Sequence, residues 1–100
     1  MEVTVPLFDR DIAAIKACYA EYYDGKGLVR FADDPAAAEG GFLSSAGLSG
    51  SDAMEVSAYG NSERVILVAR FDNLGKGASG AAIQNMNIVI GAREDTGLVV

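Results

Sequence analysis

Apolar and polar residues alternate along this chain with two different periods, which separate the expected strands from the expected helices. Residues 2–7 and residues 54–59 alternate with a period of two, as strands with one buried face do. Residues 64–71 are instead almost continuously apolar, which is typical of a central strand covered on both faces. In the strand at residues 54–59, the side chains predicted to face outward are Glu55, Ser57 and Tyr59.

Turn-forming residues mark the connections between these segments. Residues 60–63, Gly-Asn-Ser-Glu, predict a hairpin between the second and third of them. Residues 27–31 indicate one more short strand, and Ala36–Glu39 a single helical turn. Residues 40–52 are rich in Gly, Ser and Ala and predict a long solvated loop with one short strand at most. Pro6 places the first strand near a sheet edge.

Two segments carry the helical period instead. The first follows Asp9, its expected N-cap, and is closed by Gly25. Its apolar face consists of Ile12, Ile15, Tyr19, Tyr22 and Tyr23. The second runs from about Ser79 to Ile90 and stops at Gly91. The order β-α-β-β-β-α within residues 1–100 predicts a single α+β domain with a mixed, largely antiparallel sheet.

The second helix carries an apolar face that needs a partner. Its residues are Ala82, Ile83, Met86, Val89 and Ile90. Burial of the four large side chains is worth roughly 6–10 kcal/mol before entropy is subtracted. We therefore expect the helix to fold back on its own sheet or to pack across a subunit interface. Met86→Asp is then expected to destabilise the protein by more than ~2 kcal/mol.

Composition narrows the classes of function. The net charge is −6 with no basic cluster, so nucleic acid is not an expected partner. No apolar run approaches the ~20 residues of a membrane span, and the N-terminus is unlike a signal peptide, so we expect a cytoplasmic protein. The absence of histidine removes the commonest base and metal ligand, and no catalytic or metal-binding residue is predicted. Cys18 lies mid-helix with no neighbouring base and is predicted to be structural filler.

The segment Asp72–Asn87 combines the chain's densest glycines with the second helix. It reads Asp-Asn-Leu-Gly-Lys-Gly-Ala-Ser-Gly-Ala-Ala-Ile-Gln-Asn-Met-Asn and follows the most apolar strand directly. Glycines ahead of a helix leave free backbone N–H groups, which suit an anion or the polar edge of a cofactor. An ordinary strand-to-helix turn accounts for the spacing as well.

This segment resembles the C-terminal motif of N-acetyl-γ-glutamyl-phosphate reductase, the NADP-dependent enzyme of arginine biosynthesis. The resemblance continues through Tyr59-Gly60, residues 64–70 and Gly97-Leu98. It implies the C-terminal dimerisation domain of the semialdehyde dehydrogenase type, also seen in glyceraldehyde-3-phosphate dehydrogenase. Since it covers nearly the whole chain but only about the last third of the family's enzyme, we expect the nucleotide-binding domain to be absent.

The resemblance implies a role in closing the cofactor site. The residues expected to contact NADP, once the missing domain is present, are Asn73, Lys76, Gly77, Ala78, Ser79 and Gln84. The alternatives are a solvated surface charge for Lys76 and a polar helix face for Gln84. At residues 49–53 the chain reads Ser-Gly-Ser-Asp-Ala where the family has an Asn-Gly-Thr-Asn-Arg type of signature. With Ala53 in place of the arginine, this loop is not expected to bind an anion.

Two functions therefore stand side by side. In the first, the chain is the C-terminal portion of the reductase, a homodimer that works with the nucleotide-binding domain. It is inactive alone, because the family's nucleophilic cysteine motif, its histidine and the dinucleotide fingerprint have no counterparts here. In the second, it is a free-standing binding or scaffold domain derived from the reductase without its chemistry.

Overall fold

The alternating and apolar segments form the four strands of one sheet in a computed structural model, which describes residues 1–100. The strands are β1 (Glu2–Phe8), β2 (Val29–Phe31), β3 (Met54–Gly60) and β4 (Arg64–Phe71). Their order is β1-β4-β3-β2, with β4 antiparallel to both neighbours and β2 parallel to β3. The predicted mixed, largely antiparallel sheet is confirmed, and Pro6 does lie in an edge strand.

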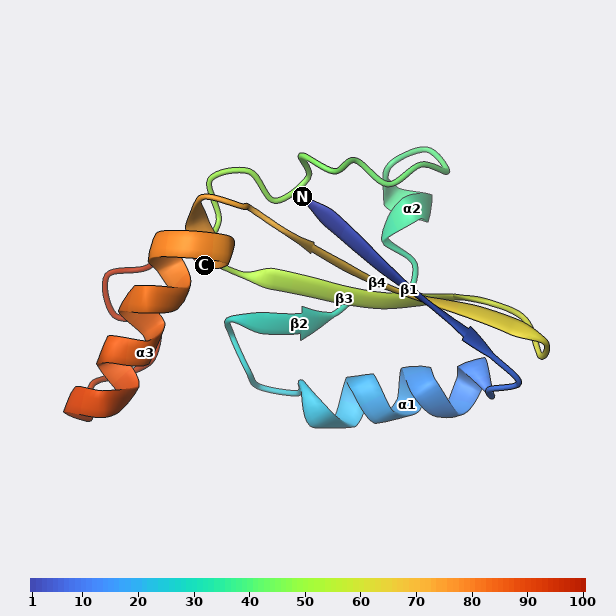
Figure 1. The fold of residues 1–100 in the computed structure, drawn as a ribbon, viewed down its shortest axis with the longest axis horizontal. Helices are drawn as coiled ribbons and strands as arrows, with labels where there is room; N and C mark the ends of the chain where they lie inside the picture. Colours follow the sequence, from blue (N-terminus) through green and yellow to red (C-terminus); the bar gives the residue numbers. More distant parts are fainter.

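The helices lie on both sides of this sheet and beyond its end. They are α1 (Ile12–Tyr22), α2 (Pro35–Ala38), the π-helix η1 (Gly75–Ser79) and α3 (Gly80–Ile90). In Figure 1, α1 runs along one side of the sheet, and α2 with the loop after it lies on the other. There α3 stands past the end of the strands. The α+β class is confirmed, and none of the helices has the length and apolar character of a membrane span.

The N-cap of α1 differs from the prediction. Asp11, not Asp9, caps the helix, because its carboxylate accepts the N–H of Ala13 at 3.0 Å. Asp9 sits in the preceding turn with φ of 52° and donates its N–H to the carbonyl of Glu63 at 3.1 Å. The turn thus uses the tolerance of aspartate for positive φ and leaves the capping to the next aspartate.

The core on the α1 side follows the predicted alternation. Val56 and Ala58 of β3 face this side and are buried, as is Val65 of β4. From α1, the ring of Tyr19 lies 6.1 Å from that of Phe31 on β2. The apolar face of α1 therefore covers the β2–β3 side of the sheet, but Tyr22, which was predicted to belong to that face, is 60% exposed.

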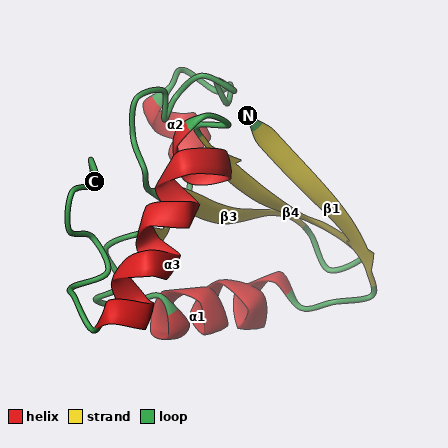
Figure 2. Cartoon of the chain, turned by 60° about the vertical axis from the view of Figure 1, so that its left-hand side comes forward, coloured by secondary structure: helices red, strands yellow, loops and turns green.

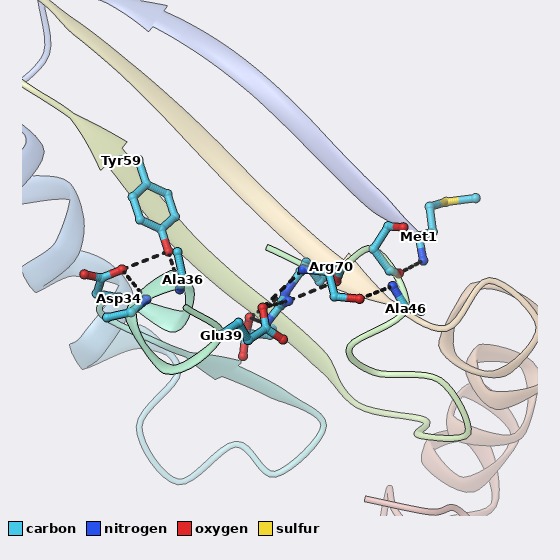
Figure 3. Close-up of polar contacts among 11 residues, drawn as sticks. Met1, Asp34, Ala36, Glu39, Ala46, Tyr59 and Arg70 are labelled. Carbon is cyan, nitrogen blue, oxygen red and sulfur yellow. Dashed lines mark hydrogen bonds and ion pairs between the residues drawn. The ribbon is translucent and has the colours of Figure 1, made fainter. Parts of the chain in front are cut away.

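The opposite face is covered too, as the continuous apolar run of β4 predicted and the alternation of β3 did not. Ser57 and Val68 are each 2% exposed on this face. The hydroxyl of Tyr59 accepts the N–H of Ala36 at 3.1 Å and donates to the carboxylate of Asp34 at 3.3 Å (Figure 3). The side chains of β3 that were predicted to face outward do lie on this face, and α2 and residues 39–52, hereafter the covering loop, lie over them.

A buried guanidinium fastens the covering loop to the sheet. Arg70, whose side chain is 5% exposed, donates to Glu55 through Nε at 2.9 Å and Nη2 at 2.7 Å. Its Nη1 donates to Glu39 at 2.7 Å and to the carbonyl of Ser44 at 3.0 Å (Figure 3). Burial lowers the pKa of Arg70, but its hydrogen bonds to the two carboxylates more than offset this, and the group stays charged.

The covering loop is exposed along most of its length, but it is held at both ends. Glu39 accepts the N–H of Ser44 at 3.2 Å, and Asp72 accepts the N–H of Gly50 at 2.7 Å. These backbone bonds are the main reason that the pKa values of Glu39 and Asp72 lie below their ordinary range. The loop contains no strand. It is largely exposed, as predicted, but these hydrogen bonds tether it to the rest of the domain.

The apolar face of α3 is uncovered except at Ile83, which is half-buried. Met86, Val89 and Ile90 are 55%, 84% and 66% exposed, so the helix does not fold back on its own sheet as one alternative predicted. Its buried positions are Gly80 and Asn87, on the side where residues 91–100, hereafter the C-terminal tail, return along the helix (Figure 2). The expected cost of Met86→Asp therefore does not hold for this chain by itself.

We expect Arg70→Ala to lower the free energy of unfolding by about 3 kcal/mol or more, because it leaves Glu55, whose side chain is 12% exposed, without its partner. The matched control is Lys16→Ala, which breaks the exposed 2.9 Å ion pair with Asp33 and is expected to cost less than about 1 kcal/mol. Urea unfolding followed by circular dichroism compares them. Equal losses would show that Arg70 does not hold the loop.

Candidate functional site

The segment after β4 begins with a turn built on one aspartate. The carboxylate of Asp72 accepts the N–H of Leu74 at 2.9 Å, and its carbonyl accepts the N–H of Gly77 at 2.9 Å. Because the same carboxylate also holds Gly50 of the covering loop, the turn and the loop are fixed to each other. Asp72 thereby ties the start of this segment to the covering loop, which Arg70 in turn holds to the sheet.

The predicted free N–H groups are largely used within the segment. Residues 75–79 form the wide turn of a π-helix, in which the N–H and the hydroxyl of Ser79 both donate to the carbonyl of Leu74, at 3.3 and 3.0 Å. The N–H of Gly80 bonds to the carbonyl of Gly75. With the N–H of Gly77 bonded as well, the expectation of an open row of donors is wrong, since the glycines wind the chain instead of leaving it extended.

Two of the glycines make room for a carboxylate. A Cβ on Gly80 would lie 2.3 Å from Oδ1 of Asp52 and 2.8 Å from the carbonyl oxygen of Gly75. A Cβ on Gly75 would lie 2.9 Å from the same Oδ1. Asp52, which the sequence placed in a solvated loop, therefore packs directly on the start of α3.

Lys76 and Gln84, two of the predicted contact residues, are brought together. The ammonium of Lys76 donates to Oε1 of Gln84, whose Nε2 donates to the carboxylate of Glu94 at 3.1 Å. Burial lowers the pKa of Lys76, and the nearby carboxylates of Glu94 and Asp52 oppose that effect. Lys76 is therefore not a solvated surface charge, which was the alternative prediction. Gln84 is the middle member of a hydrogen-bonded row of side chains, between Lys76 and Glu94.

The remaining predicted residues lie at the surface of the same turn. Asn73, Gly77, Ala78 and Ser79 are exposed around Lys76. Their contact with NADP stays a prediction. Cys18, expected to fill space in the fold, is exposed on α1 instead.

The side chains that sequence reasoning missed belong to α3 and the C-terminal tail. Asn87 is 3% exposed, and its Nδ2 donates to the carbonyls of Glu94 and Thr96 at 3.0 and 2.9 Å. At the end of the tail, the N–H of Asp52 donates to the carbonyl of Val99 at 2.6 Å, and the N–H of Val99 donates to the carboxylate of Asp52 at 2.9 Å. Gln84 and Asn87 stand three positions apart on one helix face, the one signal in the sequence for this contact.

A cavity of about 560 Å³ opens beside this row of side chains. It lies between the end of α1 with the residues that follow it and the C-terminal tail. Among its lining residues are Tyr22, Tyr23, Lys26, Gln84, Arg93 and Glu94. The amide of Gln84 thus lines a space of the size that a small ligand needs.

The structure is an α+β domain in which a hydrogen-bonded lysine–glutamine pair lies at the start of a protruding helix. No protein-family model matches the chain. The chain is 38% identical over 107 residues to N-acetyl-gamma-glutamyl-phosphate reductase 2 of Nostoc sp., a match that covers 98% of this chain and 33% of the relative. It is 41% identical over 100 residues to the reductase of Allorhizobium ampelinum, with 92% and 32% covered.

The chain therefore matches part of an N-acetyl-γ-glutamyl-phosphate reductase, and it spans about a third of the length of these curated relatives. This confirms the resemblance drawn from the Asp72–Asn87 segment. The reductase of Rhizobium meliloti, 39% identical over 100 residues, gives the same result.

We expect Gly80→Ala to destabilise the protein by ~1–3 kcal/mol, because its Cβ would overlap Asp52 and the backbone of Gly75. Helix propensity alone predicts the opposite sign, a gain of about 1 kcal/mol. Gly27→Ala is the control, since nothing lies within 4 Å of a Cβ there. A Gly80→Ala variant that melts at or above the native temperature would contradict the observed packing.

Proposed function

We propose that this chain is the C-terminal portion of an NADP-dependent N-acetyl-γ-glutamyl-phosphate reductase of arginine biosynthesis, acting in the cytoplasm. The observation that carries the proposal is the match of 92–98% of the chain to reductases of that name. The role of this portion is to form a dimer and to close the cofactor site, and the nucleophile and base come from elsewhere in the enzyme.

The residues of this chain bind and orient; they do not carry the reaction. Reduction of an acyl phosphate needs a thiolate, an acid–base group and a hydride, which NADPH supplies when bound. The chain has no histidine, and Cys18 is exposed in the middle of α1. Neither feature suits a nucleophile with its base, so this chain alone is expected to have no turnover.

Lys76 suits an anionic group of the cofactor. Its ammonium is half-buried, forms no ion pair within 4.0 Å, and has the neutral amide of Gln84 as its hydrogen-bond partner. A charge in that state keeps its attraction for a phosphate oxygen. We therefore propose that Lys76 and Gln84 contact the phosphate or nicotinamide end of NADP, with Asn73, Gly77, Ala78 and Ser79 at the rim.

The exposed face of α3 suits the nucleotide-binding domain that the resemblance implies. Met86, Val89 and Ile90 form an apolar stripe on a helix that protrudes beyond the sheet (Figure 1). Burial of each is worth ~1.5–3 kcal/mol, so a second domain seated there gains stability from it.

The edge of the sheet suits a second copy of the chain. Val3 and Val5 stand on one face of β1 and are 43% and 47% exposed, because α1 packs toward the other edge of the sheet, over β3 and against Phe31 of β2. Apolar side chains exposed side by side on a sheet are typical of an interface. We propose a homodimer formed through this part of the sheet.

A chimeric enzyme tests the reductase assignment. We expect a chimera in which this chain replaces the matching third of the Nostoc reductase to reduce the acyl phosphate with NADPH. Lys76→Ala in the chimera is expected to raise KM for NADPH about tenfold, the effect of losing one charge-assisted contact of ~1.4 kcal/mol. Arg30→Ala, on the short strand β2, is the control. The scaffold alternative would be favoured by a folded chimera without activity, and Lys76 has no cofactor role if its variant keeps the native KM.

We expect the chain to be a dimer at tens of micromolar and Val5→Lys to make it monomeric, because a charge on this face must lose its water in the interface. Thr4→Lys is the control, since position 4 lies on the opposite face of the same strand. Light scattering gives the mass of each. A native chain that is monomeric at this concentration rules the dimer out.

A further inference from the structure

We propose that Glu94 is a positioning residue, which fixes the amide of Gln84 so that its oxygen faces Lys76. This inference rests on the proposed contact of Lys76 and Gln84 with the cofactor. It assigns a function to the C-terminal tail, which otherwise only returns along α3 (Figure 2).

The direction of the Gln84 amide follows from its two partners. An ammonium only donates hydrogen bonds, and an ionised carboxylate only accepts them. An amide between the two has both bonds satisfied in one orientation, with Oε1 toward Lys76 and Nε2 toward Glu94, and this is the orientation observed. Without the carboxylate, the Nε2 group loses its fixed acceptor and the amide is free to turn.

Glu94 is able to hold Gln84 because its own backbone is anchored. Buried Asn87 lies one turn after Gln84 on the same face of α3 and donates to the carbonyl of Glu94 at 3.0 Å. A second bond from Asn87 to Thr96 and the paired bonds between Asp52 and Val99 hold the tail further on. The carboxylate therefore reaches Gln84 from a fixed point.

The charge of Glu94 also reaches Lys76. Burial favours the neutral amine, whereas the carboxylates of Glu94 and Asp52 favour the ammonium, which is the form that attracts an anion. A variant that removes the charge of Glu94 leaves Asp52 as the opposing carboxylate. The pKa of Lys76 is then expected to fall, and a residue that served only to stabilise the tail would not move it.

The experiment is NMR on the 100-residue chain with 13C-labelled lysine. We expect Glu94→Ala to lower the pKa of Lys76 and to speed hydrogen exchange of the Gln84 side-chain amide roughly two- to tenfold, the loss of one hydrogen bond. Glu94→Gln keeps an acceptor but no charge, so the pKa falls while exchange stays near native. Asp95→Ala removes the adjacent carboxylate, which pairs with Arg93, and is expected to change neither.

The inference is wrong if Glu94→Ala changes the two readouts no more than Asp95→Ala does. Its failure is distinct from that of the proposed function. If the NMR effects are found but Lys76→Ala leaves KM of the chimera unchanged, Glu94 positions Gln84 and the cofactor contact is wrong. If Lys76→Ala raises KM and Glu94→Ala has no NMR effect, the cofactor contact holds and the positioning is wrong.

Discussion

The ion-paired guanidinium of Arg70 is the interaction on which the arrangement of this domain depends. It is buried between β3 and the covering loop and uses Glu55 on the sheet and Glu39 at the loop's start. A buried charge without partners costs several kcal/mol. Because Glu39 is one of the two partners of Arg70, the start of the covering loop is held against the sheet. The loop in turn delivers Asp52 to the start of α3. A charge pair on the sheet thereby sets the place of the segment in which Lys76 lies.

The glycines of the Asp72–Asn87 segment serve close packing more than they serve exposed backbone donors. Gly75 and Gly80 admit the carboxylate of Asp52, and Gly77 is already bonded to the carbonyl of Asp72. Among its side chains, the cation of Lys76 and the amide of Gln84 are bonded to each other. A glycine-rich turn before a helix is thus compatible with a cofactor contact made by side chains, without the row of free N–H groups that such turns often supply.

The polar and apolar faces of α3 are reversed relative to those of a surface helix in a self-contained domain. Its inner face carries Gln84 and Asn87, which bond to the C-terminal tail, and its outer face carries Met86, Val89 and Ile90. A helix in a complete domain turns its apolar stripe inward. The outward stripe agrees with a match to one third of a longer reductase, in which further chain is available to cover it.

The sequence by itself determined the features that depend on residues close together along the chain. Alternation gave the strands, the Gly60–Glu63 hairpin gave an antiparallel pair, and Gly91, with φ of 74°, ended α3 where predicted. The hairpin register also sets Glu55 opposite Arg70, a pairing that follows from the position of the turn. The Asp72–Asn87 segment was enough for the family, because sixteen consecutive positions are far more specific than a spacing.

Only the tertiary structure decided which element covers each face and which side chains meet. Periodicity reports that a helix has an apolar side, but it does not say whether a partner lies there, and for α3 the covering element is a tail that meets its polar side. Asp52 contacts Gly80, 28 positions further along the chain. Glu39 pairs with Arg70, 31 positions further along. Contacts over such separations depend on the path of the loop between them, and that path is fixed by the folded sheet and leaves no local pattern.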